Sequence, residues 1–211
     1  MHEIALFIFI ICVCLYAIML FYGLKRPLTI RRGIITATYN NWVDVMLKKD
    51  GSTIVGIQAI RNLLMGASIF ISALLVLLGI LIGLYSIMGN ENYLFLGTFT
   101  LTLSYTQIGL ILLVIIFSLF NFVFSVRMAI RLTFLISAEP HKLSFDNYDA
   151  IQLTKNTLIS LQNYWMFGIR GLFYLVPALT WLLDPLFFIL GSISVTIYLI
   201  VFQDILVLRR H

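Results

Sequence analysis

The chain has 211 residues, of which 61% are hydrophobic and only 11% are charged, and its mean hydropathy is +1.03. A soluble domain carries about 25% charged and roughly 45–50% apolar residues. A chain of this length exposes too much surface to hide such an apolar excess in one water-soluble core. The composition therefore excludes an ordinary soluble enzyme, a disordered chain and a disulfide scaffold, and it predicts an integral membrane protein.

The first apolar stretch covers residues 4–22, about the length that a helix needs to cross a ~30 Å hydrocarbon core. A signal peptide is the alternative, but Glu3 rather than a basic residue precedes the stretch, and no clear small-residue cleavage site follows it. We therefore predict a retained transmembrane helix. Its Cys12 and Cys14 are the only cysteines of the chain, and they imply neither a disulfide framework nor a zinc site.

The segment after this span is polar and basic, and it contains Pro27, which breaks helices. Between residues 33 and 48, apolar residues recur every three or four positions. This spacing predicts an amphipathic helix in the membrane interface, with Trp42 as its anchor. Asp50-Gly51 then predicts a turn, and Ser52 is a suitable N-cap for the helix that leads into the second span, residues 63–88.

The rest of the chain predicts three further spans and a second amphipathic helix. The spans cover residues 107–126, 164–183 and 186–202, and the amphipathic helix covers residues 147–161. The helix of the third span continues to Ser137, and residues 93–106 form either an interfacial segment or the start of that span. A four-span alternative treats the last hydrophobic region as one bent hairpin. The predicted fold is a single all-α membrane domain, a bundle of four or five transmembrane helices with two amphipathic helices on the cytoplasmic side.

The basic residues predict the orientation of this bundle. With an outside N-terminus, residues 22–62, residues 127–170 and the C-terminal tail lie inside and hold all 14 Lys and Arg residues. Cytoplasmic enrichment of Lys and Arg is the strongest topology signal in a membrane protein sequence. We therefore predict an outside N-terminus, an inside C-terminus and a location in a bacterial-type inner membrane. The net charge of +5 then marks a membrane face rather than a nucleic-acid-binding surface.

Patterns that indicate an enzyme are missing from the sequence. The three histidines are far apart and have no partner ligand at i+3 or i+4, which argues against metal and haem sites. No glycine-rich phosphate loop and no nucleophile elbow appears. We therefore predict a protein that is not an enzyme, with no catalytic residues, no metal and no cofactor.

Five polar residues are predicted at the cytoplasmic edge of the membrane. Arg61 and Asn62 open the second span, Arg127 and Arg131 share a helical face at the end of the third, and Arg170 lies inside the fourth. In a structural interpretation, the arginines reach lipid phosphates and Asp204 pairs with Arg170 or Arg127. In a functional interpretation, the cluster forms a pocket or pore mouth for an anion such as a lipid headgroup, phosphate or carboxylate.

Small residues and one proline predict close helix packing. Gly79 and Gly83 form a G-x-x-x-G motif in the second span, and Gly66 precedes them on the same helix. Packing within one chain and packing between identical chains are both compatible with this motif. Pro177 predicts a packing kink, with a gating hinge as the alternative. Asp184 beside Pro185 predicts a helix cap.

Two blocks resemble the membrane protein family called domain of unknown function 599. The first is Gln58-Ala-Ile-Arg61-Asn62-Leu-Leu-Met-Gly66-Ala67, preceded by Trp42-Val43 and Lys49-Asp50, and the second is Gly168-x-Arg170, Phe173-Tyr174, Pro177, Trp181 and Pro185. Met166 and Asp184 depart from the residues expected in the second block. The resemblance covers roughly residues 39–204, and it implies a helical membrane protein without supplying an activity.

Two functions from different classes fit these observations. The first is a small helical subunit or scaffold of a larger membrane complex, which binds anionic lipids at the arginine cluster and has protein partners or further copies of itself in the membrane. The second is a homo-oligomeric channel or transporter for a small solute or anion.

Overall fold

The computed structural model describes residues 2–25, 31–48, 52–87, 93–96, 99–102, 105–138, 144–145 and 148–201. The chain divides into two compact units. Unit 1 comprises Met1–Gly33, Leu74–Ser118 and Ile169–His211, and unit 2 comprises Ile34–Ala73 and Leu119–Gly168. Three long helices each contribute one part to each unit, namely α3 (Ser52–Ile87), α4 (Tyr105–Ser137) and α5 (Ala150–Thr180).

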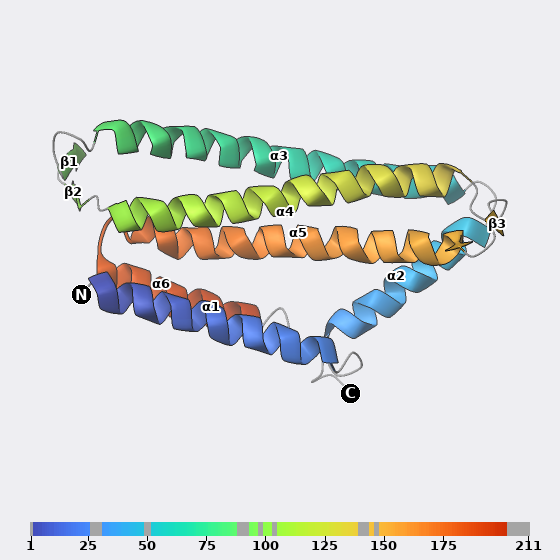
Figure 1. The fold of residues 1–211 in the computed structure, drawn as a ribbon, viewed down its shortest axis with the longest axis horizontal. Helices are drawn as coiled ribbons and strands as arrows, with labels where there is room; N and C mark the ends of the chain where they lie inside the picture. The colour runs from blue at the N-terminus through green and yellow to red at the C-terminus, as the bar shows by residue number, and fades with distance from the viewer. Residues whose placement is uncertain are drawn as a thin grey trace. The chain divides into compact units, whose positions relative to one another are not determined.

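Unit 1 contains α1 (His2–Lys25) and α6 (Pro185–Tyr198), which lie side by side (Figure 1). Aromatic side chains fill the space between helices of this unit. Phe9 of α1 stacks on Phe188 of α6 with ring centroids 5.2 Å apart and meets the Tyr174 ring of α5 edge-on at 5.8 Å. Trp181, just after α5, stacks on the Phe188 ring with the ring centroids 4.5 Å apart. Such contacts add to ordinary packing because aromatic edges and faces carry opposite partial charges.

The start of α6 confirms one prediction directly. Asp184 accepts a hydrogen bond at Oδ1 from the backbone N–H of Leu186, at 2.7 Å, and Pro185 occupies the first turn of the helix. The carboxylate thus satisfies one of the free N–H groups at the helix start, where proline costs no hydrogen bond.

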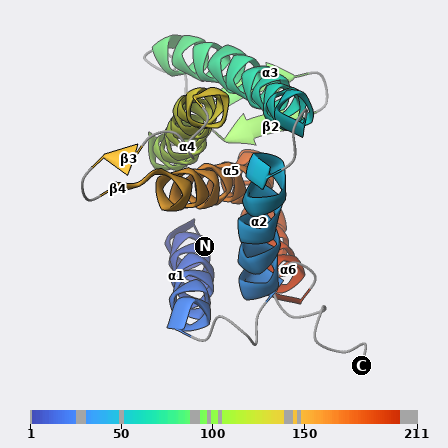
Figure 2. The same cartoon turned by 90° about the vertical axis from the view of Figure 1, so that its right-hand side faces the viewer.

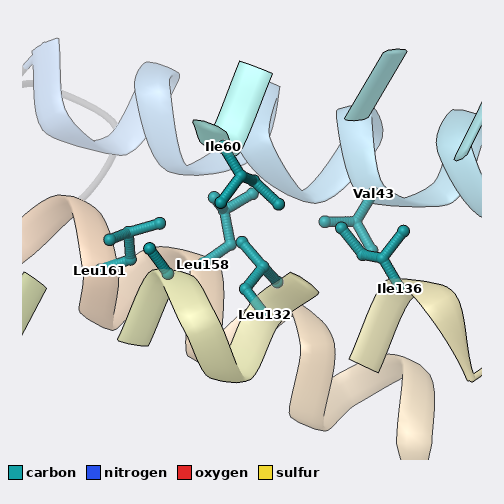
Figure 3. Close-up of a cluster of buried hydrophobic side chains, with 7 residues drawn as sticks. Val43, Ile60, Leu132, Ile136, Leu158 and Leu161 are labelled. Atoms are coloured by element: carbon teal, nitrogen blue, oxygen red, sulfur yellow. The ribbon is translucent and has the colours of Figure 1, made fainter. Parts of the chain in front are cut away.

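Unit 2 contains α2 (Arg31–Lys48) and the remaining parts of α3, α4 and α5. Aliphatic side chains from all four helices converge on one core (Figure 3). Its buried members are Val43, Ile60, Ala129, Leu132, Ile136, Leu158 and Leu161. At the edge of this core, Lys155 Nζ of α5 lies 2.8 Å from Asp44 Oδ1 of α2, and the two side chains are partly exposed. Apolar contacts therefore form the interior of unit 2, and the ion pair lies at its border.

Two short hairpins connect the long helices. Strand β1 (Tyr93–Leu96) pairs antiparallel with β2 (Phe99–Thr102) between the ends of α3 and α4 (Figure 1). Strand β3 (Ser144–Phe145) pairs with β4 (Tyr148–Asp149) directly before α5 (Figure 2). For residues 93–106, the alternative that they start the helix of the third span holds only for Tyr105 and Thr106, where α4 begins, because residues 93–96 and 99–102 form the hairpin.

Most predicted helices are confirmed by the structure. Residues 4–22 lie in α1, residues 33–48 lie in α2, and α4 continues to Ser137 as predicted. Helix α3 contains the predicted span up to residue 87 and begins at Ser52, and α6 with its continuation covers the last span to residue 201.

The predicted division between residues 147–161 and 164–183 is wrong, because α5 runs without interruption from Ala150 to Thr180. The hydropathy of the sequence changes near Gln162 and Asn163, and this change alone predicts the end of one helix and the start of another. Neither residue interrupts the backbone, however, and the only proline in α5 is Pro177 near its end. A change from an amphipathic to an apolar pattern therefore does not by itself end a helix.

Three of the described helices are long and apolar enough to cross a membrane, and they lie within α1, α3 and α4. The apolar helix formed by residues 185–201 is shorter, and α5 does not belong to this group although it has 31 residues. The protein is thus a helical protein with several apolar helices compatible with a membrane location. Its number of spans and its orientation stay predictions.

Candidate functional site

The outer face of α4 in unit 2 carries two of the predicted site residues. Arg127 and Arg131 are both exposed and lie one turn apart. The buried residues of this part of α4 follow a different stripe, Phe122, Ser125, Ala129, Leu132 and Ile136. The two guanidinium groups therefore project away from the core of unit 2 and share one surface of α4.

The surroundings of these arginines are apolar. Phe124, Ile130 and Phe134 are exposed to 39%, 48% and 71%. The Phe124 ring lies 5.4 Å from the ring of Tyr164 on α5, so the two rings border this surface on the side of α5. Arginines on an apolar helix surface are typical of the border between hydrocarbon and headgroups, since the side-chain stem packs on apolar groups while the charged end reaches phosphates. We call this surface the α4 arginine face, defined by Arg127 and Arg131.

Arg61 and Asn62 are exposed on the part of α3 that belongs to unit 2. Phe70 of α3 stacks on Phe122 of α4 at 5.2 Å, and Ile60 shares the core with Leu132. Because these pairs run in opposite directions along the two helices, Arg61 lies at the same level of the bundle as Arg131. Arg61 and Arg131 therefore share one level of unit 2, and both lie on its surface.

Arg170 belongs to unit 1 and differs from the other three arginines because it is buried, with only 4% of its surface exposed. Its Cζ atom lies 5.2 Å from the centre of the Tyr16 ring of α1. The Tyr16 ring is in turn 6.1 Å from the Tyr174 ring, and the Tyr174 hydroxyl lies 3.3 Å from Thr196 Oγ1. A cation over an aromatic face is worth about 2 kcal/mol when both are desolvated. Tyr16, Tyr174 and Thr196 were not among the predicted site residues.

The predicted pair of Arg170 with Asp204 lies partly outside the described residues, because Asp204 follows residue 201. The pair stays a prediction.

The glycines differ in how closely other groups approach them. A Cβ on Gly66 would lie 3.4 Å from the Trp165 ring, whereas a Cβ on Gly79 or Gly83 would meet nothing within 4 Å. The G-x-x-x-G motif therefore faces open space in the described part of this one chain. Packing within one chain and packing between identical chains both stay predictions. Pro177 is buried. A Cβ added at Gly191 of α6 would lie 3.1 Å from the Cβ of Pro177.

Two closer helix approaches were not predicted. A Cβ on Gly168 would lie 2.9 Å from the Phe122 ring in unit 2. A Cβ on Gly171 would overlap Ser118 Oγ in unit 1 and lie 3.1 Å from Ser118 Cβ. Glycine is required where two helices come this close. The sequence feature that could have predicted these close approaches is the pair Gly168 and Gly171, three residues apart on α5.

Three buried serine and threonine hydroxyl groups in unit 1 bond to their own helix. Ser118, Ser192 and Thr196 donate to the carbonyl oxygens four residues earlier, at 2.6–2.9 Å. Gln107 Nε2 donates to the carbonyl oxygen of Trp181 at 3.0 Å. These bonds allow polar residues in an apolar interior at little cost. Within the described ranges, no group of three or more His, Cys, Asp or Glu residues is placed to hold a metal ion.

The comparisons with known proteins confirm the resemblance found in the sequence. A family model described as "Protein of unknown function, DUF599" matches residues 4–205, nearly the whole chain. No curated protein and no solved structure matches the chain.

Proposed function

The chain belongs to the DUF599 family, and we propose that it is a non-enzymatic integral membrane protein that binds anionic lipid headgroups at the α4 arginine face. In this proposal it is a small helical subunit or scaffold of a larger complex in a bacterial-type inner membrane. The observation that carries the proposal is the position of Arg127 and Arg131 among exposed apolar side chains.

The chemistry of guanidinium supports an oxyanion as the ligand. Its planar fork donates two parallel hydrogen bonds to a phosphate, and it is more weakly hydrated than the ammonium group of lysine. Two forks one turn apart on α4 can contact one phosphate diester or two neighbouring ones. Arg61, at the same level on α3, extends the positive surface along the headgroup plane.

The proposed role as a subunit has a separate support. The part of α3 in unit 1 exposes Gly79 and Gly83 between large apolar side chains such as Val76, Ile80 and Ile82. A smooth strip of this kind lets another membrane helix approach closely. Copurification of a partner or of a homo-oligomer under mild detergent is expected, and a purified monomer without any stable partner contradicts this part of the proposal.

A second candidate function, an anion channel or transporter, is favoured by the buried polar groups of unit 1. Arg170, Tyr174, Ser192 and Thr196 bring a charge and hydroxyl groups into an otherwise apolar interior. Buried charges in membrane segments often mark substrate pathways. In this candidate, Arg170 rather than the α4 arginine face would be the essential cation.

The test uses the full chain purified with its lipids. We expect Arg127→Gln/Arg131→Gln to reduce retention of phosphatidylglycerol, measured by native mass spectrometry, while phosphatidylcholine retention is unchanged. The matched comparison is Arg131→Gln against Lys155→Gln, since each removes one positive charge from unit 2 but Lys155 pairs with Asp44. Equal phosphatidylglycerol retention in all variants contradicts the proposed headgroup site.

The same variants separate the two functions after reconstitution into vesicles. Absence of chloride and phosphate flux in the wild-type protein contradicts the channel candidate. Flux that is lost in Arg170→Gln but kept in Arg127→Gln/Arg131→Gln supports it over the lipid-binding subunit.

A further inference from the structure

One face of α3 is exposed along the part of the helix that belongs to unit 2. The exposed positions on this face alternate in spacing between three and four residues, which is the heptad pattern of a coiled-coil seam. Met65 and Ile69 are 54% and 68% exposed although both side chains are apolar. We call this surface the α3 seam, and within unit 2 it is defined by Val55, Gln58, Asn62, Met65, Ile69 and Ser72.

The opposite side of α3 carries the contacts within the chain. Ile60 and Ala67 are both buried, and Ile60 belongs to the core of unit 2 (Figure 3). Each of the two lies two residues from a seam position on either side, which is about 200° around a helix with roughly 3.6 residues per turn. The chain therefore packs on the back of α3, and the α3 seam stays exposed.

The same spacing continues in the part of α3 that belongs to unit 1. Val76, Gly79 and Gly83 are exposed and follow Ser72 at intervals of four, three and four residues. The pattern thus extends over residues 55–83, which is about four heptads, and a heptad pattern of this length indicates a coiled coil. Leucine is a common residue at such positions, so the pattern does not depend on the two glycines.

We propose that the α3 seam pairs with the α3 seam of a second copy of this chain in a parallel, left-handed coiled coil. The inference rests on the membrane location in the proposed function, and it names the partner that the proposed subunit binds. Copies inserted in one membrane have the same orientation, so their α3 helices run parallel. In a two-fold dimer of parallel helices, each seam residue meets its own equivalent.

Asn62 favours an identical partner. Its side-chain amide carries both donors and an acceptor, so two facing Asn62 side chains can satisfy each other, and Gln58 has the same chemistry. An asparagine at a core position of a parallel coiled coil specifies the register and the number of helices. In this register, Arg61 at the flank of the seam meets the second copy's Gly66 rather than another arginine. The charge of Arg61 therefore does not oppose the pairing.

Disulfide formation between copies tests the pairing in membranes that contain the full chain. Ile69→Cys places a thiol in the α3 seam, and the matched control Ile130→Cys places one at an exposed isoleucine of α4 in unit 2. We expect oxidation to link two chains through position 69 and far less through position 130. Mass spectrometry of the linked peptides separates these links from any through Cys12 or Cys14. Absence of a link at position 69, or equal yields at both positions, overturns the proposal.

Charge variants test the contribution of Asn62. Asn62→Lys brings two ammonium groups together in the proposed dimer, and we expect the protein to shift from the mass of two chains to that of one, 24.1 kDa, in native mass spectrometry. Asn156→Lys adds the same charge at an exposed asparagine of α5 in unit 2, and we expect the dimer to persist. A dimer that persists equally in both variants contradicts pairing through Asn62.

A third variant separates this inference from the proposed headgroup site. We expect Arg127→Gln/Arg131→Gln to lower phosphatidylglycerol retention while the disulfide yield of Ile69→Cys in the same chain is unchanged. Unchanged phosphatidylglycerol retention with a normal disulfide yield contradicts the headgroup site alone. Wild-type protein that retains phosphatidylglycerol but has the mass of a single chain overturns the dimer alone.

Discussion

The two units of this protein treat arginine in opposite ways. Unit 2 buries a core of aliphatic side chains and exposes Arg61, Arg127 and Arg131. Unit 1 buries Arg170 beneath the Tyr16 ring, in an interior that also contains the hydroxyl of Thr196. Four arginines that the sequence groups in one predicted cluster therefore belong to two different environments.

The difference shows that membership of one predicted cluster does not define the role of a charged residue. An exposed arginine on an apolar face can be removed at little cost to the stability of the fold, because its guanidinium group interacts mostly with lipid or solvent. A buried arginine has lost its hydration, so its protein contacts must compensate for that loss. We therefore expect changes in unit 1 to affect folding and changes on the outer face of unit 2 to affect binding.

The largest effect is expected from Gly171→Leu in unit 1. The new side chain would overlap Ser118, so α4 and α5 cannot keep their present separation. Overpacking of a well-packed interior costs about 1–3 kcal/mol and occasionally more, and we expect a loss beyond this range because two helix backbones must move apart. We expect a large fall in the thermal unfolding temperature of the protein in detergent, or failure to obtain folded protein.

The control is Gly79→Leu, because a side chain at Gly79 meets nothing within 4 Å in this chain. We expect unfolding at or slightly above the wild-type temperature, since glycine in a helix is roughly 0.8–1.0 kcal/mol less favourable than alanine and leucine ranks close to alanine. Equal losses at both positions would show that Gly79 packs against a second molecule, which is the oligomeric alternative for the G-x-x-x-G motif.

The next effect is expected from Arg170→Met, which tests the predicted pair with Asp204. Removing one partner of a buried ion pair costs about 3–5 kcal/mol, because the remaining charge has no compensation. If the pair exists, Asp204→Asn in the Arg170→Met background restores much of the lost thermal stability. Additive losses from the two substitutions contradict the pair.

The positions of most helices along the chain could be predicted from the sequence, because they depend on local signals. Apolar runs, Pro27 and the Asp184 cap are read directly from neighbouring residues, and five of the six helices in the described residues agree with these signals. The exception, α5, lacks a helix breaker at the point where its hydropathy changes. Hydropathy describes the surroundings of a helix, whereas its ends depend on backbone hydrogen bonds and caps.

The partners of the site residues could not be predicted in the same way. Helix α1 is apolar on all sides, so no contrast in polarity marks Tyr16 as the residue that faces Arg170. Asp44 and Lys155 are 111 positions apart, and nothing local relates them. The helical period predicts that Arg127 and Arg131 share one face of α4. Whether that face is exposed depends on which side of α4 the other helices of unit 2 cover.

The smallest effect is expected from Asp44→Asn, which removes the ion pair with Lys155 in unit 2. The side chains are 38% and 18% exposed, and pairs in contact with solvent contribute about 0.2–1 kcal/mol. We expect a small fall in the unfolding temperature that shrinks at high salt, because dissolved ions screen the attraction. Lys155→Met and the double variant complete the cycle, and the coupling between the two positions measures the pair. A loss as large as that of Arg170→Met would mean that unit 2 also depends on a buried charge, and the contrast between the two units would then not hold.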